Sequence, residues 1–313
     1  MIGAIDIGGT KIAVGVVDEG GRVLSRAEFP TDAQRGYAHA LGRMEKMLRQ
    51  TAEDAGTKIT GVGIGCTGPV NPFTGEIGDV EFLPGWQAAN PVMDFGQRFG
   101  VRVAMENDAD AAALGEASWG AGKVKKRLVY VTVGTGIGGG MIFDQQLYRG
   151  VDQSHPEIGH HVIDPSGPRC SCGANGCWEV LARGPAMVEW MKEQAPNHPH
   201  SAELTGKRVC ELAQQGDELA RKAVSREAYY LGLGLANLVT LFSPDSIVLG
   251  GSVMHSAHLF LGDIHKIIRQ NCGFVPFRKT ELALASLGSD AALIGAARVW
   301  RHHFGQNGGE HAS

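Results

Sequence analysis

Two stretches of this chain repeat one layout. Residues 2–18 (IGAIDIGGTKIAVGVVD) and 128–144 (LVYVTVGTGIGGGMIFD) each pass through an apolar strand, a turn of glycine and threonine, a second apolar strand and a closing Asp. Apolar runs joined by tight glycine turns predict a β-hairpin in each stretch. An internal repeat of this kind indicates two related α/β halves that face each other. Two unrelated hairpins with similar turns are the alternative.

The remaining sequence predicts alternating strands and helices. Helix 217–242 carries apolar side chains in steps of three and four, as a buried helical stripe requires. Residues 69–90 are rich in Pro and Gly and predict a loop. Further strands are expected at 22–29, 59–65, 101–106, 246–249 and 280–285, and further helices at 36–55, 108–119, 256–271 and 289–302.

Length and charge bound the class of protein. A chain of 313 residues suggests two domains, and a net charge of −4 argues against a nucleic-acid partner. The densest basic run, residues 123–127, is expected to be a solvated loop. No stretch approaches the ~20 apolar residues of a membrane span, and no signal peptide precedes the first strand, so we expect a cytoplasmic protein without membrane contact. The tail 305–313 is expected to be disordered.

The first glycine turn has the residue types of a phosphate site. Gly8 and Gly9 let a ligand approach the backbone, whose N–H groups can cradle phosphate together with the Thr10 hydroxyl. Lys11 adds positive charge, and Asp6 is placed to hold Mg²⁺ directly or through water.

A second turn, at residues 134–140, has the same character. The repeat of such turns in two halves predicts opposed loops that grip a nucleoside triphosphate. Gly134–Gly139 fits G-x-G-x-x-G but lies between two strands, so a dinucleotide fingerprint is rejected, and no P-loop spacing is present. The expected phosphate-binding residues here are Gly134, Thr135, Gly136 and Gly138. The pair Gly250-Gly251 is expected to line the base or ribose of the nucleotide, and a plain strand-to-helix turn is the alternative.

A histidine and three cysteines gather near the middle of the chain. Cys170, Cys172 and Cys177 with one nearby histidine make a full tetrahedral shell for zinc, and closed shells of this type are usually structural. Spacing alone leaves the histidine open between positions 155, 160 and 161. The metal would clamp a loop that presents Glu157 and Glu179. The other cysteines, Cys66, Cys210 and Cys272, are expected to be buried free thiols.

Asp108 is the candidate catalytic acid or base of the sequence. Asp108 follows the strand that ends at Glu106-Asn107, and ligands of α/β sheets bind at strand ends. Asp108 is the candidate base that accepts the proton of an attacking sugar hydroxyl, with Asn107 bonded to the same substrate. Asn107 or Asp108 as a helix N-cap is the alternative interpretation. The polyol-binding residue types nearby are Asn107, Asp108, Glu157, His160 and Glu179.

These motifs together resemble the ROK family of sugar kinases. The matching segments are AIDIGGTK (4–11), ENDA (106–109), GTGIGGG (134–140), EIGH (157–160) and CSCGANGCWE (170–179), and the resemblance runs from residue 1 to about 302. It implies an α/β, actin-like (ribonuclease H-like) two-domain fold with a zinc-binding loop and a cleft that closes on sugar and ATP. The implied domains are residues 1–112 with about 290–313, and residues 113–289.

The resemblance also implies roles for single residues. Asp108 corresponds to the catalytic base; Gly68, Asn107, Glu157, His160 and Glu179 to sugar ligands; and His160, Cys170, Cys172 and Cys177 to the zinc ligands. The implied activity is ATP-dependent phosphorylation of a hexose, with glucose to glucose 6-phosphate first. A homodimer or higher homo-oligomer is the family expectation.

One departure from the family pattern concerns the sugar. Ser154-His155-Pro156-Glu157 stands where many glucokinases of the family have Ala-Gly-Glu. The alternatives are therefore an N-acetylglucosamine or N-acetylmannosamine kinase, or a fructokinase. A sugar-responsive repressor is the remote alternative.

Overall fold

The computed structural model describes residues 1–305, so the predicted tail and the predicted domain piece 290–313 fall outside it from residue 306 on. Two compact units divide the chain. Unit 1 comprises Met1–Leu128, Gly140–Pro156 and the chain from Ala285; unit 2 comprises Val129–Gly139 and Glu157–Leu284. The predicted domain boundaries at 112 and 290 stay predictions. The compact units divide the chain elsewhere because the helix after Asp108 packs along the C-terminal helix within unit 1.

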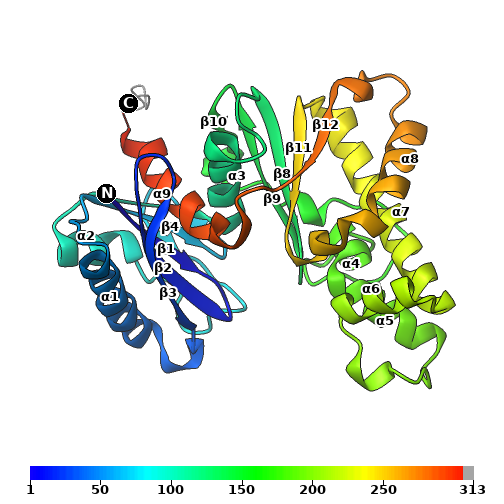
Figure 1. The fold of residues 1–313 in the computed structure, drawn as a ribbon, viewed down its shortest axis with the longest axis horizontal. Coiled ribbons are helices and arrows are strands. Elements are labelled where there is room, and N and C mark those ends of the chain that lie inside the picture. The colour runs from blue at the N-terminus through cyan, green and yellow to red at the C-terminus, as the bar shows by residue number, and fades with distance from the viewer. Residues whose placement is uncertain (306–313) are drawn as a thin grey trace. The chain divides into compact units, whose positions relative to one another are not determined.

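Unit 1 is built on a five-stranded sheet with the order β3-β2-β1-β4-β7 (Figure 1). β2 pairs antiparallel with β1 and β3, whereas β1, β4 and β7 are parallel. The strands are β1 (Ile2–Ile7), β2 (Lys11–Val17), β3 (Val23–Pro30), β4 (Gly61–Cys66) and β7 (Val103–Asn107). A separate small hairpin, β5 (Val70–Asn71) with β6 (Glu76–Ile77), lies within the predicted loop.

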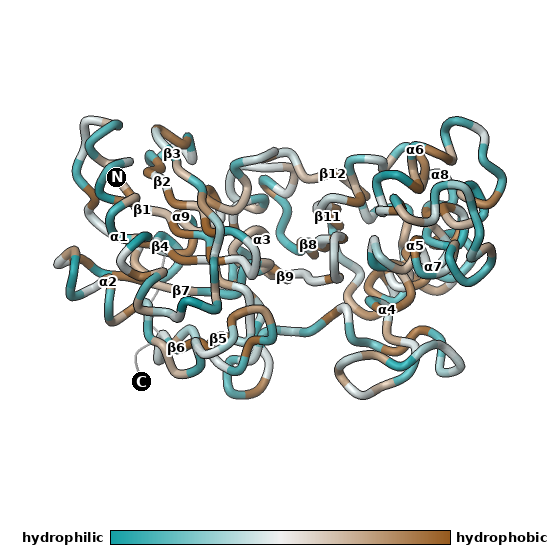
Figure 2. The backbone as a smooth tube through the Cα atoms, turned by 90° about the horizontal axis from the view of Figure 1, so that it is seen from below, coloured by the Kyte–Doolittle hydropathy of each residue, from teal (hydrophilic) through white to brown (hydrophobic). Residues whose placement is uncertain are grey.

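Helices cover both faces of this sheet. α1 (Tyr37–Asp54) and α2 (Pro91–Phe99) share one apolar core with β1 and β4, and α9 (Ala291–Phe304) forms a second core with β1 and β2. Figure 2 shows hydrophobic segments concentrated in these strands and in α9. On β4 the glycines 61, 63 and 65 alternate with apolar residues, and a Cβ on Gly63 would lie 1.9 Å from the Ala296 carbonyl oxygen. The glycines therefore let α9 lie directly on the sheet.

The second sheet has the order β10-β9-β8-β11-β12. Its strands are β8 (Arg127–Val133), β9 (Ile137–Phe143), β10 (Gln146–Leu147), β11 (Ser246–Gly250) and β12 (Glu281–Leu284). Position for position, this order matches that of the first sheet, with the β8–β9 pair in the place of the β1–β2 hairpin. The predicted repeat of two related α/β halves is therefore confirmed.

Unit 2 contains more helix than strand. Its helices are α4 (Trp178–Ala182), α5 (Gly184–Gln194), α6 (Gly206–Gln215), α7 (Glu218–Phe242) and α8 (Leu261–Asn271), with short 3₁₀ turns between them. α7 buries the predicted stripe and packs against α5, α6 and α8. The sequence analysis did not predict α2, α4, α5 or α6, and Ser252–Leu259 is a 3₁₀ segment that precedes α8. No helix of residues 1–305 is both long enough and apolar enough to span a membrane.

Glu227 is a buried carboxyl in the middle of α7. Its side chain is fully buried, and neither carboxyl oxygen has a hydrogen-bond partner among the described residues. Burial raises the pKa of Glu227 well above its usual range. The group is therefore protonated in the folded state at a pH where the unfolded chain has already lost the proton.

The sign of the pH dependence follows from this raised pKa. The stability that belongs to protonated Glu227 is complete below about pH 4.3 and falls as pH rises, by about 1.4 kcal/mol per unit, up to the folded-state pKa. Glu227→Gln should remove this slope, so its unfolding free energy relative to wild type rises from pH 5 to pH 8. Denaturant unfolding across that range measures it. Glu193→Gln, at an exposed position on α5, is the control; equal slopes in all three proteins would contradict the prediction.

Candidate functional site

The predicted base lies at the carboxyl edge of the first sheet. The register aligns Ile7 of β1 with Cys66 of β4, and Cys66 with Asn107 of β7. Because the three strands are parallel, their next segments all begin at one edge. These segments start at Gly8, Thr67 and Asp108. The edge therefore gathers the first glycine turn, the Gly68 loop and the start of α3 (Asp108–Trp119).

Asn107 is the N-cap of α3, and Asp108 is its first residue. The Asn107 Oδ1 accepts the Ala109 N–H at 2.9 Å, and the Asp108 Oδ1 accepts the same N–H at 2.8 Å. A Cβ on Gly68 would lie 2.8 Å from the Asn107 Nδ2, so the loop that begins with Thr67 passes directly over this amide. Asn107 is buried and Asp108 is exposed. The capping interpretation is correct for Asn107, and Asp108 beside it is an exposed residue whose Oδ1 shares the Ala109 N–H.

Asp6 lies close to Asp108. A Cβ on Gly65, between β1 and β7, would lie 3.7 Å from the Asp108 Cα and 3.8 Å from the Asp6 Oδ1. Burial and, next, the Asp108 charge raise the pKa of Asp6 to about 7. The same burial raises the pKa of the neighbouring Cys66 thiol well above its usual range. Two carboxylates so placed favour a cation between them, because a positive charge would stabilise both ionised forms.

The first glycine turn is closed by its own backbone. The Gly8 N–H donates to the Lys11 carbonyl at 3.0 Å, and the Thr31 hydroxyl donates to the Gly8 carbonyl at 2.6 Å. Thr10 and Lys11 are exposed, and the Lys11 ammonium pairs with Glu28 at 3.1 Å. The Gly8 N–H is thus occupied, and within this turn the Thr10 hydroxyl and the Lys11 ammonium remain at the surface.

In unit 2 the two other glycine segments meet. Gly251 has φ +88°, and a Cβ there would lie 2.3 Å from the Val133 carbonyl oxygen. A Cβ on Gly250 would lie 2.4 Å from the Tyr130 hydroxyl, and one on Gly134 would lie 3.5 Å from the Ser252 Oγ. β11 can therefore end against β8 only because Gly250 and Gly251 lack side chains, whereas a Cβ on Gly134 would make an ordinary van der Waals contact. The structure brings together the Gly134–Gly136 turn and the Gly250–Gly251 pair.

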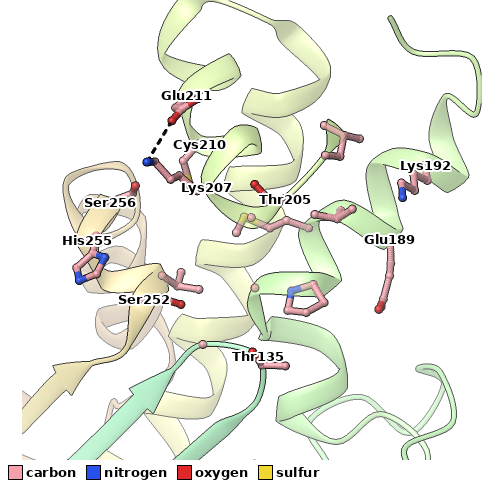
Figure 3. Close-up of a pocket in the computed structure, with 18 of the residues that line it drawn as sticks. Thr135, Glu189, Lys192, Thr205, Lys207, Cys210, Glu211, Ser252, His255 and Ser256 are labelled. Carbon is pink, nitrogen blue, oxygen red and sulfur yellow. Dashed lines mark ion pairs between the residues drawn. The ribbon is translucent and has the colours of Figure 1, made fainter. Parts of the chain in front are cut away.

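A cavity of about 900 Å³ opens above this junction within unit 2. Gly134 and Thr135 form its floor, and α5, α6 and the segment from Ser252 to Ser256 form its walls (Figure 3). Its charged lining residues are Glu189, Lys192, Lys207 and Glu211, of which the last two pair at 3.9 Å. The sequence analysis missed the α5 and α6 residues of this cavity, because nothing in their spacing links them to the glycine turns.

Four predicted zinc ligands gather in one loop of unit 2. One donor atom each from His160, Cys170, Cys172 and Cys177 lies within 4.8 Å of the others. The His160 Nδ1 and Cys170 Sγ are 3.5 Å apart, and the Cys172 and Cys177 Sγ atoms are 3.4 Å apart. All three cysteines are free thiols. His161 instead directs its Nδ1 to the Ile158 carbonyl and takes no part in the cluster. The donor set and its spacing fit a tetrahedral metal ion.

The two acids beside this loop differ in their settings. The Glu179 Oε2, on α4, accepts the Ile137 N–H at 2.9 Å, and a Cβ on Gly136 would lie 2.4 Å from that oxygen. Glu179 is thus fixed against the turn between β8 and β9. Glu157 is exposed at the start of the short 3₁₀ turn that ends at His160. The predicted sugar ligands divide between the units: Gly68, Asn107 and Asp108 in unit 1, and Glu157, His160 and Glu179 in unit 2.

A buried ion-pair network flanks Asp108 in sequence and was not predicted. Arg149 pairs with Glu106 and, at 2.6 Å, with Asp110. His155 bonds Asp110 at 2.8 Å, and His303 of α9 bonds Glu106 at 2.8 Å. The network holds the residues on both sides of Asn107-Asp108. The acids of the segment ENDAD (106–110) can be seen in the sequence. The arginine and the histidines lie far from it along the chain, so no sequence spacing links them to these acids.

The backbone at Gly176, in the loop of the four predicted zinc ligands, leaves no room for a side chain. Its φ is +67°, and an added Cβ would lie 1.6 Å from the Asp164 carbonyl oxygen. Gly176→Ala should therefore cost more than the ~1–3 kcal/mol of backbone strain alone and lower the melting temperature. Gly173→Ala is the matched control, because Gly173 also has positive φ but its nearest neighbour, the Arg169 guanidinium, lies 3.8 Å away. Equal destabilisation of the two variants would contradict this account of the loop.

Comparison with known proteins identifies the family. Residues 2–303 match the ROK family. A glucokinase of Streptomyces coelicolor is 36% identical, over 95% of this chain and 96% of its own length. The structure of a ROK family glucokinase from Streptomyces griseus, in complex with glucose and AMPPNP, superimposes with a TM-score of 0.82 at 34% identity, covering 96% of this chain and 99% of that one. A ROK hexokinase from Thermus thermophilus gives 0.82 at 32% identity, covering 96% and 97%.

These likenesses confirm the predicted mixed α/β, actin-like fold with its two sheets. They also agree with the motifs from which the family resemblance was drawn, from AIDIGGTK to the cysteine loop. The chain belongs to the ROK family.

Proposed function

We propose that this protein is a glucokinase that phosphorylates glucose to glucose 6-phosphate with ATP. The observation that carries the proposal is the full-length likeness to glucokinases, one of them solved with glucose and an ATP analogue. The N-acetylhexosamine kinase, fructokinase and repressor alternatives are not favoured. Glucokinases match over more than nine tenths of both chains at 29–36% identity, whereas a putative N-acetylmannosamine kinase that matches as fully is 25% identical, and a xylose repressor matches over 53% of its own length. A panel of glucose, mannose, fructose, N-acetylglucosamine and N-acetylmannosamine, compared by kcat/KM, tests the choice of sugar.

Asp108 is the proposed catalytic base. Its exposed carboxylate stands at the strand edge, where it accepts the proton of the sugar hydroxyl that attacks the γ-phosphate. The Asn107 side chain is positioned by its cap bond to Ala109 and by the Gly68 loop. The proposed sugar ligands are Gly68, Asn107, Glu157, His160 and Glu179.

The proposed ATP-binding residues are those of the three glycine segments. In unit 2 the proposed phosphate-binding residues are Gly134, Thr135, Gly136 and Gly138. Gly250 and Gly251 precede Ser252, which lines the cavity that is proposed to take the nucleoside. In unit 1 the proposed phosphate-binding residues are Gly8, Gly9, Thr10 and Lys11, of which Thr10 and Lys11 offer exposed side chains, and Asp6 is proposed to hold Mg²⁺. Such a site works by positioning and by neutralising charge on the transferred phosphoryl group.

The proposed zinc is structural. His160, Cys170, Cys172 and Cys177 would supply all four ligands, so no position stays open for catalysis. The ion would hold the loop between Glu157 and Glu179 and fix the ring orientation of His160. A cytoplasmic location, the absence of a nucleic-acid partner and assembly into a homodimer or larger homo-oligomer stay predictions from the sequence.

Substitution of the base separates chemistry from binding. Asp108→Asn should lower kcat at least ~100-fold, because the amide cannot accept the proton, while glucose binding stays measurable. Steady-state kinetics and calorimetric titration with glucose measure the two effects. Asp263→Asn, at an exposed position on α8, should behave as wild type. Near-normal turnover of Asp108→Asn would remove this residue from its role.

Metal analysis tests the zinc site. Purified protein should contain about one zinc per chain, and Cys172→Ser should lower both the zinc content and the melting temperature, since structural zinc binding is coupled to folding. Ser171→Ala, between two ligands, should change neither. Active wild-type protein with well under one zinc per chain would contradict a structural zinc.

A further inference from the structure

A second large cavity lies within unit 1, away from every residue assigned above. Its volume is about 970 Å³. α3, the loop that follows it, the β9–β10 hairpin and α9 supply most of its walls. Five cationic side chains line it, against Glu19 as the single acidic lining residue among those described; the cations are Lys123, Lys125, Lys126, Arg298 and Arg301. Four residues of the run 123–127, which was expected to be a solvated loop, therefore line the cavity, and three of them are lysines.

Backbone contacts hold the lysine loop in this place. The Glu116 carbonyl accepts the N–H groups of Gly120 and Gly122, and the Glu116 carboxylate accepts the Ala121 N–H at 2.7 Å. The Lys126 carbonyl accepts the Asp144 N–H at 2.6 Å, which ties the loop to the β9–β10 turn. The loop is therefore a fixed part of unit 1, and its lysines emerge from a defined backbone.

Among residues 1–305, the two arginines of α9 have no negatively charged partner. Arg298 and Arg301 are three residues apart, on one side of the helix, and both are half-buried. Arg298 donates to the Ser118 hydroxyl at 2.6 Å, and the Arg301 Nε is buried without a hydrogen-bond partner. Burial and, next, the Arg301 charge lower the pKa of Arg298. Within residues 1–305 neither arginine forms an ion pair, nor do Lys123 and Lys126.

We propose that this basic cavity binds a small molecule that carries two or more phosphate charges. Half-buried cations that repel one another are stabilised by an anion between them, and the fork of an arginine with the point charge of a lysine matches phosphate oxygens. The proposed phosphate site goes beyond the proposed kinase function, and its test rests on that function only for filling the active site with glucose and nucleotide.

Calorimetric titration with the active site filled tests the proposal. Wild-type protein saturated with glucose and a non-hydrolysable ATP analogue is titrated with sodium tripolyphosphate in one arm and glucose 6-phosphate in the other, which distinguishes an inorganic from a sugar phosphate. At least one should bind, with an affinity that falls as salt is added. Arg301→Gln and Lys126→Gln should each weaken that binding about tenfold, the effect of losing one charge-assisted hydrogen bond.

The controls separate this site from general surface charge and from misfolding. Lys46→Gln removes an exposed cation of α1 outside the cavity and should bind as wild type. Lys126 is exposed, so its variant should keep the wild-type melting temperature even where Arg301→Gln loses stability. The proposal is overturned by the absence of binding in both arms, by unchanged binding in Lys126→Gln, or by an equal loss in Lys46→Gln.

Discussion

The parallel register of β1, β4 and β7 is the constraint on which the proposed chemistry depends. It places the ends of three strands at one edge, so that Asp6, Gly68 and Asp108 come from distant parts of the sequence to one place. Closely spaced glycines on β4 allow α9 and α3 to lie directly against the sheet, on the face that α1 and α2 do not cover. A slip of one residue in β7 would turn Asn107 to the opposite face and separate the base from its neighbours.

Unit 2 reaches a defined arrangement through close backbone contacts. Gly251 against Val133, and Gly136 against Glu179, remove side chains where a ligand or a carboxylate must come near the main chain. A metal bound to His160, Cys170, Cys172 and Cys177 would further restrain the backbone of this loop, because it would hold the four donor atoms close to each other. Polar groups become a fixed surface because their backbone cannot move, which is the condition for charge stabilisation in phosphoryl transfer.

The sequence predicted what local patterns encode. Apolar runs and glycine turns identified both hairpins and the repeat. The strand end before Asp108 led to its prediction as the base, which stays a prediction. The four-ligand cluster followed from types and spacing, with the family resemblance choosing His160. Helices α4, α5 and α6 were missed because their short amphipathic segments lack a long apolar stripe. The Arg149 network and the basic cavity could not be predicted, because each joins residues that only the tertiary fold brings together.

The most direct measurement of the central claim is a crystal structure of the protein with glucose and a non-hydrolysable ATP analogue. The account predicts that the 6-hydroxyl of glucose lies within about 2.6–3.2 Å of an Asp108 carboxylate oxygen. It also predicts that the hydroxyl points toward the γ-phosphate. Glucose bound elsewhere, or bound with that hydroxyl turned away from Asp108, would contradict it.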